Sequence, residues 1–320
     1  MELIDRRMIA DAFRTVGLRH GDTVYIQSDL ARIGALKGMR CREDLCGAYV
    51  GALFDVIGDE GTLVVPTYTT QVARYDIDFV LEETPTLLGI FADYVRTLPG
   101  SVRSLHPVHS FAAMGAGKER ICVGNGTSDF GWDSPPHRLL EGGAKIVSIG
   151  LESGYAVGLA HHLEAAYCLP YVYNKLLKWQ PIANGIRCRR QYFGVVRHLY
   201  LKTRYDLTDF VRHMRSLQGL WSARLGGGWV HATRYEQAFA EGGKILRDRP
   251  YFLLAHEPAF EYGVIPFDGP TCGADGIGGQ ISRDQVEDIN WSGFYLAGKN
   301  FAGGDSDELD GDVPCIQQGS

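Results

Sequence analysis

The residue pair with the clearest chemical use is His161 and Glu164, which stand three residues apart in the stretch AHHLEAAY. If this stretch is a helix, the spacing places both side chains on one face, so an imidazole and a carboxylate share one space. A histidine near pH 7 can accept or donate a proton, and an acidic neighbour suits acyl or proton transfer. The alternative is an ordinary ion pair on an exposed helix, because structural pairs greatly outnumber catalytic ones.

The pair depends on the elements that precede it. The run KIVSI, residues 145–149, is apolar and has the length of a buried strand, and a glycine-containing turn separates it from the expected helix. The helix therefore starts just beyond the carboxyl end of a strand, where α/β sheets commonly bind ligands. His162 falls on a different face of this helix and is predicted to pack against other elements.

The chain alternates between strands and helices up to about residue 255. Strands are expected at TVYIQS, GTLVVPTYT, SFAAMG and LGGGWVHAT. Helices are expected over residues 2–16 and 42–57, from Thr84 or Thr86 to about residue 98, over residues 135–140, and in the stretches DLTDFVRHMRSLQ and YEQAFAEGGKILRD. A hairpin is expected around Asn184-Gly185 within residues 179–200. Because the strands lack clean polar alternation, the sheet should be covered on both faces, so we predict a three-layer α/β/α sandwich with a mixed central sheet.

Composition and charge narrow the class of protein. The 320 residues are 45% hydrophobic and 22% charged with a net charge of −6, and the seven cysteines show no CxxC spacing. We therefore expect a globular protein in the cytoplasm with reduced thiols, no metal ion and no membrane span. Nucleic-acid binding is not expected, because it needs a strongly basic face.

The carboxyl-terminal part differs from the rest. After residue 260, eleven acidic and two basic side chains occur among many glycines, with weak hydrophobic periodicity. We predict one domain over residues 1–258 and an irregular acidic extension over residues 259–320.

Polar clusters follow or precede several predicted strands. They lie at residues 27–30, 66–70 and 103–111, and in the turn before His161. Taken singly, Ser28 and Asp29 fit a helix cap, Thr67 and Tyr68 a strand end, and His106 a turn histidine. No GxGxxG or GxxxxGK[ST] string stands in a strand-to-helix context, so a dinucleotide or triphosphate loop is not expected.

In order along the chain, these pieces resemble the aminoglycoside 3-N-acetyltransferase-like (antibiotic N-acetyltransferase) family. The matching stretches are GDTVYIQSDLARIG, GTLVVPTYT, TPTLLGIFADYVRTLPG, RSLHPVHSFAAMG, SDFGWDSPPHRLLEGGAKIVSIG, and HHLE followed by Pro170-Tyr171. The resemblance covers about residues 10–255, and RSxHPxxSFAAxG is its most specific motif. It implies transfer of an acetyl or other short acyl group from acyl-CoA to an amine.

The resemblance also implies roles for individual residues. His161 would be the general base and Glu164 would orient it or balance its charge. The residues implied beside coenzyme A are Gln27, Ser28, Asp29, Leu30, Arg103, Ser104, His106, Ser110 and Phe111, and those implied beside the acceptor are Thr67, Tyr68 and Arg197. Gln27 and Asp29 stand where the family usually has His and Ser, so the side chains at these two positions depart from the family pattern.

The expected mechanism is direct attack of the amine on the thioester, without an acyl-enzyme, with backbone N–H groups near Ser28 and Asp29 stabilising the oxyanion. The acceptor would be an amino sugar. An aminoglycoside acceptor is polycationic and would need an acidic pocket. The stretch RCRRQYFGVVRHLYLK is instead rich in arginine, which favours an acceptor with phosphate groups, such as a nucleotide-linked amino sugar. The alternative is that this stretch is only a solvated hairpin.

Two further interpretations stay open. The first is a serine hydrolase that pairs Ser110 or Ser28 with His161, although no GxSxG elbow supports it. The second is a catalytically silent descendant that binds coenzyme A or a sugar. The sequence does not decide the oligomeric state, and a homodimer is left open.

Overall fold

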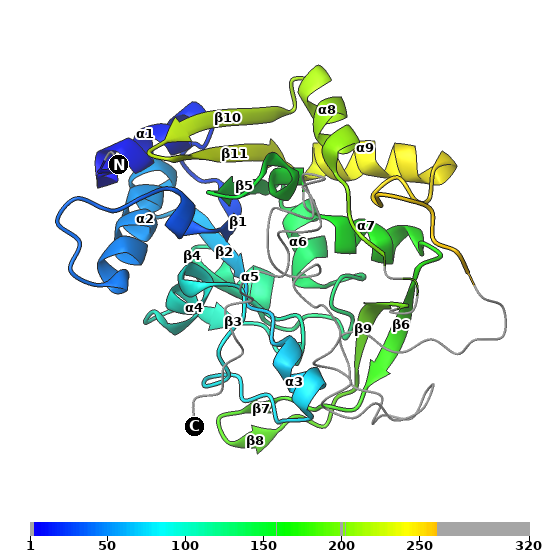
Figure 1. Cartoon of the computed structure of the whole chain (residues 1–320). Helices are drawn as coiled ribbons and strands as arrows, with labels where there is room; N and C mark the ends of the chain where they lie inside the picture. The colour runs from blue at the N-terminus through cyan, green and yellow to red at the C-terminus, as the bar shows by residue number, and fades with distance from the viewer. Residues whose placement is uncertain (1–2, 158, 199–200, 202, 261–320) are drawn as a thin grey trace.

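The computed structural model describes residues 3–157, 159–198, 201 and 203–260. Its centre is a seven-stranded sheet with the order β10-β11-β5-β1-β2-β4-β3, and helices lie on both sides of it (Figure 1). The strands of this sheet are β1 (Thr23–Ser28), β2 (Thr62–Pro66), β3 (Val102–Arg103), β4 (Phe111–Gly115), β5 (Lys145–Ile149), β10 (Leu220–Leu225) and β11 (Gly228–Arg234).

The sheet is mixed. Its central strand β1 runs parallel to both neighbours, β2 and β5, while the outer pairs β5–β11, β10–β11, β2–β4 and β3–β4 are antiparallel. The three parallel strands therefore end at one edge, which is the edge where a ligand site is expected.

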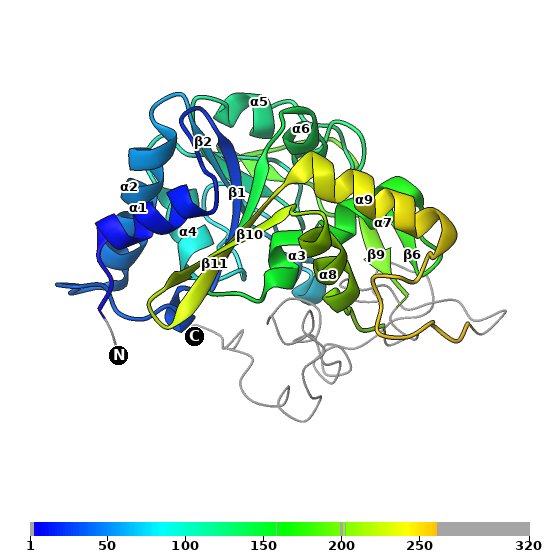
Figure 2. The same ribbon diagram turned by 90° about the horizontal axis from the view of Figure 1, so that it is seen from above.

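Helices cover the two faces of the sheet. They are α1 (Arg6–Thr15), α2 (Arg42–Ile57), α3 (Thr70–Tyr75), α4 (Ile90–Thr97), α5 (Lys118–Cys122), α6 (Pro135–Glu141), α7 (Ala160–Tyr167), α8 (Thr208–Ser216) and α9 (Tyr235–Asp248), with the 3-10 turns η1 (Leu30–Arg32) and η2 (Ser153–Val157). One hydrophobic core joins α1, α2 and α4 to the sheet, and a second joins α5 to α9 to the opposite face (Figure 2). The predicted three-layer sandwich with a mixed sheet is confirmed.

Local sequence signals account for several helix ends. The Asp44 side chain at the start of α2 accepts hydrogen bonds from the Arg40 and Cys41 amides, and Gly58 ends the helix with φ 67°. Ser134 caps the His137 amide at the start of α6. The predicted helix bounds 42–57 and 135–140 are therefore confirmed, the second with one extra residue.

The predicted start of α4 is wrong. The helix begins at Ile90, and Thr84 and Thr86 lie in the loop before it. The Thr86 hydroxyl donates to the Tyr68 carbonyl oxygen at 3.0 Å, and its amide donates to Asp93 at 3.2 Å. These tertiary hydrogen bonds hold the loop in a non-helical path that a local capping signal cannot reveal.

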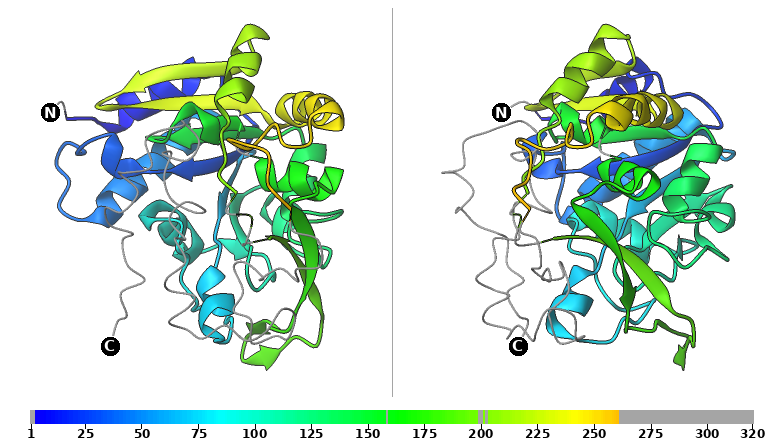
Figure 3. Two further views of the ribbon diagram at one scale, coloured as in Figure 1. Left: turned by 45° about the vertical axis from the view of Figure 1, so that its right-hand side comes forward. Right: turned by 90° about the vertical axis from the view of Figure 1, so that its right-hand side faces the viewer.

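The arginine-rich stretch also folds differently from the prediction. The Asn184-Gly185 hairpin forms, but only between β7 (Ile182–Ala183) and β8 (Ile186–Arg187). Strand β9 (Tyr192–Arg197) pairs instead with β6 (Val172–Leu177) in a separate two-stranded ribbon. This ribbon lies apart from the main sheet, near α3 and the β7–β8 hairpin (Figure 3).

The predicted carboxyl-terminal extension over residues 259–320 lies outside the described residues, except for residues 259 and 260. Across the described part of the chain, every helix is too short or too polar to cross a membrane.

Candidate active site

The segments that follow the three parallel strands lie next to one another. Residues 27–30 follow β1, Thr67 and Tyr68 follow β2, and η2 with α7 follows β5. Gly150, with φ 70°, allows the chain leaving β5 to pass the chain leaving β1, because a Cβ atom there would lie 2.0 Å from the Asp29 carbonyl oxygen. The topology thus brings three of the predicted polar clusters to one edge of the sheet.

His161 and Glu164 form the predicted pair at the start of α7. The Nδ1 atom of His161 lies 2.7 Å from Oε2 of Glu164, whose side chain is fully buried, while the His161 side chain is 31% exposed. An ionised carboxylate only accepts hydrogen bonds, so Nδ1 carries the hydrogen and Nε2 keeps the lone pair. The geometry therefore supports a histidine whose basic nitrogen is Nε2.

The charge on Glu164 is stabilised from several sides. Burial raises the pKa of Glu164, but the His161 charge and hydrogen bond, the nearby Arg197 guanidinium and the Tyr205 hydroxyl outweigh burial and lower this pKa overall. The Tyr205 hydroxyl donates to Oε1 of Glu164, opposite the oxygen that faces His161. Glu164 is thus an anion held in place to support a positively charged His161.

An aromatic wall connects this pair to the segment after β2. The Phe130 ring lies 5.3 Å from the His161 ring and 6.1 Å from Tyr68, measured between centroids. Burial raises the pKa of Tyr68, so its hydroxyl stays protonated. The Tyr68 ring thus packs against Phe130, which also contacts His161, whereas Thr67 is fully buried and its hydroxyl hydrogen-bonds Ser110.

A second histidine and carboxylate, for which the sequence predicts no role, lie against Phe130. Nδ1 of His109 lies 2.7 Å from Oδ2 of Asp129, and both side chains are buried. The Asp129 carboxylate also accepts the amides of Phe130 and Val195. His109 is part of the quoted HPVHS motif, but nothing in the sequence links it to Asp129, twenty residues away.

Gln27, Ser28, Asp29 and Leu30 line a pocket of about 310 Å³, as do the first residues of α4 and part of η2. The Gln27 amide nitrogen donates to the Tyr155 carbonyl oxygen at 3.2 Å, so the glutamine ties β1 to η2. Of the backbone amides near Ser28 and Asp29 that were predicted to stabilise an oxyanion, the Asp29 amide is occupied, because it donates to the Ile149 carbonyl oxygen at 2.8 Å. The parallel β1–β5 pairing continues one residue past the strand and occupies this donor.

The predicted cluster at residues 103–111 lies beneath this site. Each of its five predicted members is at most 8% exposed. Ser104 Oγ accepts the Phe111 amide at 2.9 Å. His106 accepts the His109 amide through Nδ1 and contacts the Phe193 carbonyl oxygen through Nε2, and burial lowers the pKa of His106 to about 4.

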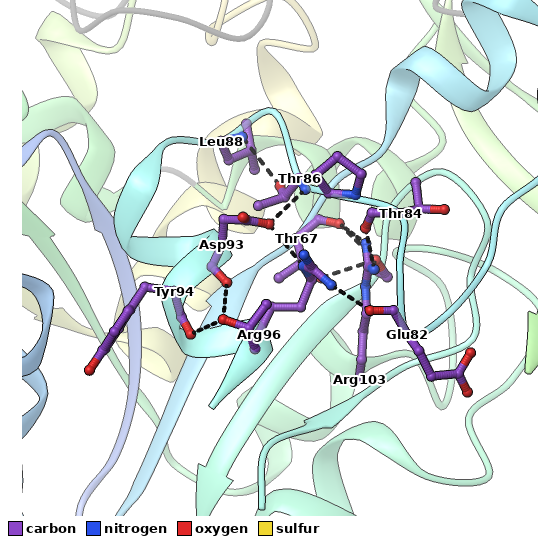
Figure 4. Close-up of polar contacts among 12 residues, drawn as sticks. Thr67, Glu82, Thr84, Thr86, Leu88, Asp93, Tyr94, Arg96 and Arg103 are labelled. Carbon is purple, nitrogen blue, oxygen red and sulfur yellow. Dashed lines mark hydrogen bonds and ion pairs between the residues drawn. The ribbon is translucent and has the colours of Figure 1, made fainter. Parts of the chain in front are cut away.

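Arg103 is buried without a carboxylate partner among the described residues. Its donors reach Ser110 Oγ at 3.0 Å and the carbonyl oxygens of Leu81, Thr84 and Thr67 at 3.0, 2.7 and 3.0 Å (Figure 4). Burial lowers its pKa to about 9, and the nearby charge of Arg96 adds to this effect. In this structure Arg103 holds the loop before α4 rather than presenting donors to a ligand.

Arg96 holds the same loop from α4. Its Nε donates to Asp93 at 2.9 Å and its Nη1 to the Glu82 carbonyl oxygen at 2.8 Å, as Figure 4 shows. The loop leads directly to Leu88 and Gly89, which line the pocket beside Ser28. The two arginines therefore fix one wall of that pocket.

Arg197 is buried, so it is not placed like an exposed arginine that binds a phosphate group. It is 8% exposed, and its guanidinium lies 4.9 Å from the centre of the Tyr205 ring, close to Glu164. Arg187, from the same basic stretch, forms a two-pronged ion pair with Asp78 at 2.9 Å. Arg197 thus belongs to the charged surroundings of the His161–Glu164 pair.

The other expectations concern helix packing and metals. His162 is buried and its Nδ1 lies 2.9 Å from the Tyr235 hydroxyl, which confirms its packing position. Within residues 3–157, 159–198, 201 and 203–260, no group of three or more His, Cys, Asp and Glu side chains is arranged to hold a metal ion.

The fold is that of the aminoglycoside acetyltransferases. The AAC(3)-IVa apoenzyme superposes with a TM-score of 0.65 at 21% identity, covering 81% of this chain and 93% of that one. The structure described as AAC-IIIb binary with CoASH superposes with a TM-score of 0.64 at 18% identity, covering 78% and 98%.

Sequence comparison goes further than the fold. The antibiotic N-acetyltransferase family, described as aminoglycoside 3-N-acetyltransferase, matches residues 26–246, and the chain belongs to this family. Aminoglycoside N(3)-acetyltransferase VII of Streptomyces paromomycinus is 31% identical over 181 residues, which are 51% of this chain and 60% of that protein. Aminoglycoside N(3)-acetyltransferase IX of Micromonospora chalcea is 29% identical over 211 residues, covering 59% and 72%. The first alignment thus spans less than two thirds of the relative's length.

Proposed function

We propose that the protein transfers an acetyl or other short acyl group from acyl-CoA to a primary amine of an amino sugar. The observation that carries this proposal is the His161–Glu164 pair, with a fully buried carboxylate and a partly exposed imidazole at the edge where β1, β2 and β5 end. The relatives named as aminoglycoside N(3)-acetyltransferases and the related structure with CoASH support the same reaction class.

The proposed mechanism begins with the acceptor amine. An ammonium group has no lone pair, so Nε2 of His161 takes one proton from it before the neutral nitrogen attacks the thioester carbon. The carbon–nitrogen bond forms, the carbon–sulfur bond breaks, and a second proton passes from the nitrogen to the sulfur, which leaves as a thiol. His161 then releases the first proton to solvent. Glu164 stabilises the imidazolium during this sequence, because its negative charge lies 2.7 Å from Nδ1.

The proposed donor site is the pocket beside residues 27–30. Its walls combine the apolar side chains of Leu30, Leu88 and Phe91 with the polar Ser28, which fits a thioester and its flexible amide-containing arm. The cofactor-binding roles of Arg103, Ser104, His106, Ser110 and Phe111 are proposed as indirect. These residues shape the pocket wall and the floor under Tyr68, since their side chains are buried.

The acceptor is proposed to lie against Tyr68, with Thr67 supporting it from below and Arg197 acting through Glu164. The relatives' names favour an aminoglycoside, and a nucleotide-linked amino sugar remains the other candidate. A serine hydrolase is less well supported. The Ser110 hydroxyl is fully buried, hydrogen-bonds the Thr67 carbonyl oxygen and accepts from Arg103, so it has no access to a substrate.

We further propose that residues 1–258 form the transferase domain. The hydrophobic cores of the described chain run from Ile4 to Leu254, which supports a domain that closes near residue 258.

Release of free thiol from acetyl-CoA, measured with a panel of aminoglycosides and nucleotide-linked amino sugars, tests the function. His161→Ala should lower the turnover rate about 10²- to 10⁴-fold, because a general base contributes that much. The matched control is His213→Ala, which removes another histidine paired with a glutamate, 3.0 Å from Glu241 and away from the site. Native turnover in His161→Ala, or ester hydrolysis without coenzyme A, would contradict the proposal.

A further inference from the structure

Tyr205 connects the His161–Glu164 pair to other parts of the chain. It lies just before α8, and it is only 3% exposed. Its hydroxyl donates to Oε1 of Glu164 and lies 3.5 Å from Nδ1 of His161. The Tyr205 ring meets the His161 ring edge to face, with centroids 5.8 Å apart and an angle of 80° between the planes. Both members of the pair therefore contact this one side chain.

The direction of the hydrogen bonds follows from the acceptor. An ionised carboxylate only accepts, so the Tyr205 hydroxyl gives its hydrogen to Oε1 of Glu164, while Nδ1 of His161 gives its hydrogen to Oε2. Each carboxylate oxygen is thus bound by a different donor. Glu164 cannot turn about its last bond without breaking one of these two hydrogen bonds, so Tyr205 helps to fix the oxygen that faces His161.

Arg197 strengthens the hydrogen bond that Tyr205 donates. Its guanidinium lies over the Tyr205 ring, 4.9 Å from the ring centre. A positive charge beside a phenol ring stabilises negative charge on the phenol oxygen, so the hydroxyl becomes a stronger donor. The arginine therefore acts on Glu164 through the tyrosine as well as through its own charge.

The groups that face Glu164 come from several elements. His161 lies on the same helix, Arg197 on β9, Tyr205 before α8 and Tyr171 before β6. Burial, followed by the charge of Glu164, raises the pKa of Tyr171, so that hydroxyl stays protonated. Among these groups, Tyr205 is the neutral donor on the oxygen that faces away from His161.

A segment after α9 holds Tyr205 from behind. Residues 253–255 pair with residues 204–206 in an antiparallel bridge, in which the Asp206 amide donates to the Leu253 carbonyl oxygen at 3.0 Å. Leu253 is fully buried and belongs to the hydrophobic core that includes Tyr205. The backbone of Tyr205 is therefore fixed by tertiary structure before a substrate binds.

On the basis of the proposed function, we propose that Tyr205 is a positioning residue that sets the pH at which the His161–Glu164 pair takes up its proton. The hydroxyl balances part of the Glu164 charge. Without it, the pair would bind a proton more tightly, whichever partner held it, because the carboxylate would keep its charge with one donor fewer. Tyr205 thus keeps His161 deprotonated, and able to act as a base, down to lower pH.

Nuclear magnetic resonance of the full chain with ¹⁵N-labelled histidine tests this effect without turnover. The signals of His161 are those lost in His161→Gln. Tyr205→Phe keeps the ring and removes the hydroxyl, so the midpoint of the His161 titration should move to higher pH by about 0.5 to 1 on the pH scale.

The matched control is Tyr235→Phe. It removes a buried hydroxyl that lies 2.9 Å from Nδ1 of His162, a residue of the same helix α7. This bond does not involve Glu164, so the variant should leave the midpoint of the His161 titration unchanged. A change in both variants would reflect a general loosening of α7 and would overturn the proposal.

The kinetics should change in the same direction. In Tyr205→Phe the acid limb of kcat/KM should move to higher pH, and kcat at the pH optimum should fall about tenfold, the lower end for loss of a hydrogen bond to a charged group. The KM for acetyl-CoA should stay the same, since other residues of the described chain line the proposed donor pocket. A purely structural role would lower the stability of both tyrosine variants without moving either pH profile.

The outcomes separate this proposal from the proposed function. A titration midpoint in Tyr205→Phe that stays in place, or moves to lower pH, would overturn the role of Tyr205. A midpoint that moves as expected beside a native profile of kcat/KM would also overturn it, because the hydroxyl would then have no part in the reaction. If the midpoint moves as expected but the native protein acylates no amine, only the proposed function is refuted.

Discussion

At the scale of single residues, the proposed chemistry depends on the burial of one carboxylate. Glu164 is fully buried, yet its charge is kept by His161, Arg197 and the Tyr205 hydroxyl. The spacing of three residues was enough to predict the His161 contact, because helix geometry is local. It could not predict Tyr205 or Arg197, which reach the site from segments more than thirty residues later in the chain.

Glu164→Gln is therefore expected to lower kcat about 10²-fold, with little change in the KM for acetyl-CoA. The amide still accepts a hydrogen bond from Nδ1, but it carries no negative charge to stabilise the imidazolium. Steady-state kinetics, with thermal unfolding to verify the fold, measures the effect. Glu241→Gln provides the control, since Glu241 pairs with His213 at 3.0 Å. A native kcat in Glu164→Gln would show that the carboxylate has no part in turnover.

At the scale of elements, the loop between α3 and α4 is held by side chains rather than by regular structure. Arg103 and Arg96 bond the carbonyl oxygens of Leu81, Glu82 and Thr84, and the loop then forms one wall of the proposed donor pocket. The motif around Arg103 thus has a structural use that differs from the ligand contact inferred from resemblance.

Arg103→Met should lower the free energy of unfolding by at least about 3 kcal/mol, because it leaves several buried carbonyl oxygens without donors. The KM for acetyl-CoA should rise as well, since the released loop carries Leu88 and Gly89. Urea unfolding and steady-state kinetics measure the two effects. Arg187→Met removes an exposed ion pair with Asp78 and a 3.4 Å hydrogen bond to the Gln180 carbonyl oxygen, and should change neither quantity appreciably. Equal stability of Arg103→Met and the native protein would show that Arg103 does not hold this loop in place.

Most helix and strand positions were predictable because their signals are local. The apolar runs of β2 and β5, the Gly58 stop of α2 and the Ser134-Pro135 start of α6 need no knowledge of the rest of the chain. The start of α4 and the pairing of β9 with β6 depend on distant partners and were missed. The same holds in the site, where the His109–Asp129 pair and the buried state of Arg103 arise only from tertiary packing.

At the scale of the whole molecule, buried histidines link stability to pH. Burial lowers the pKa of His106 to about 4, of His162 to about 3 and of His231 to about 4. In the unfolded chain each would titrate near its ordinary pKa of 6.5, so between pH 6.5 and about 4 the unfolded state binds more protons. These groups contribute stability that is present above pH 6.5 and lost as the pH falls. Glu164, whose pKa is also lowered, extends the loss to lower pH.

The free energy of unfolding should therefore be nearly constant above pH 7 and fall steadily towards pH 4.5, as measured by urea titration. His106→Gln should flatten part of this fall, because the amide can bond the same backbone groups without titrating in this range. His20→Gln, which changes a histidine with a 66% exposed side chain, should leave the slope unchanged. If the free energy of unfolding falls equally steeply with pH in His106→Gln and in the native protein, His106 does not contribute to this fall.

The central place of β1 also has a consequence for how the chain is made. Strand β1 is complete at residue 28, but its partner β5 ends at residue 149, and α1 packs against β10, which ends at residue 225. At roughly 5–20 residues per second, synthesis takes about 10–40 s to supply these partners after β1 leaves the ribosome. During that interval α2 and β2 give the first helix and strand only part of their native contacts, and the sides that face β5 and β10 have no native partner. Because of this strand order, apolar residues at the start of the nascent chain must be kept from aggregating until β5 and β10 have been made.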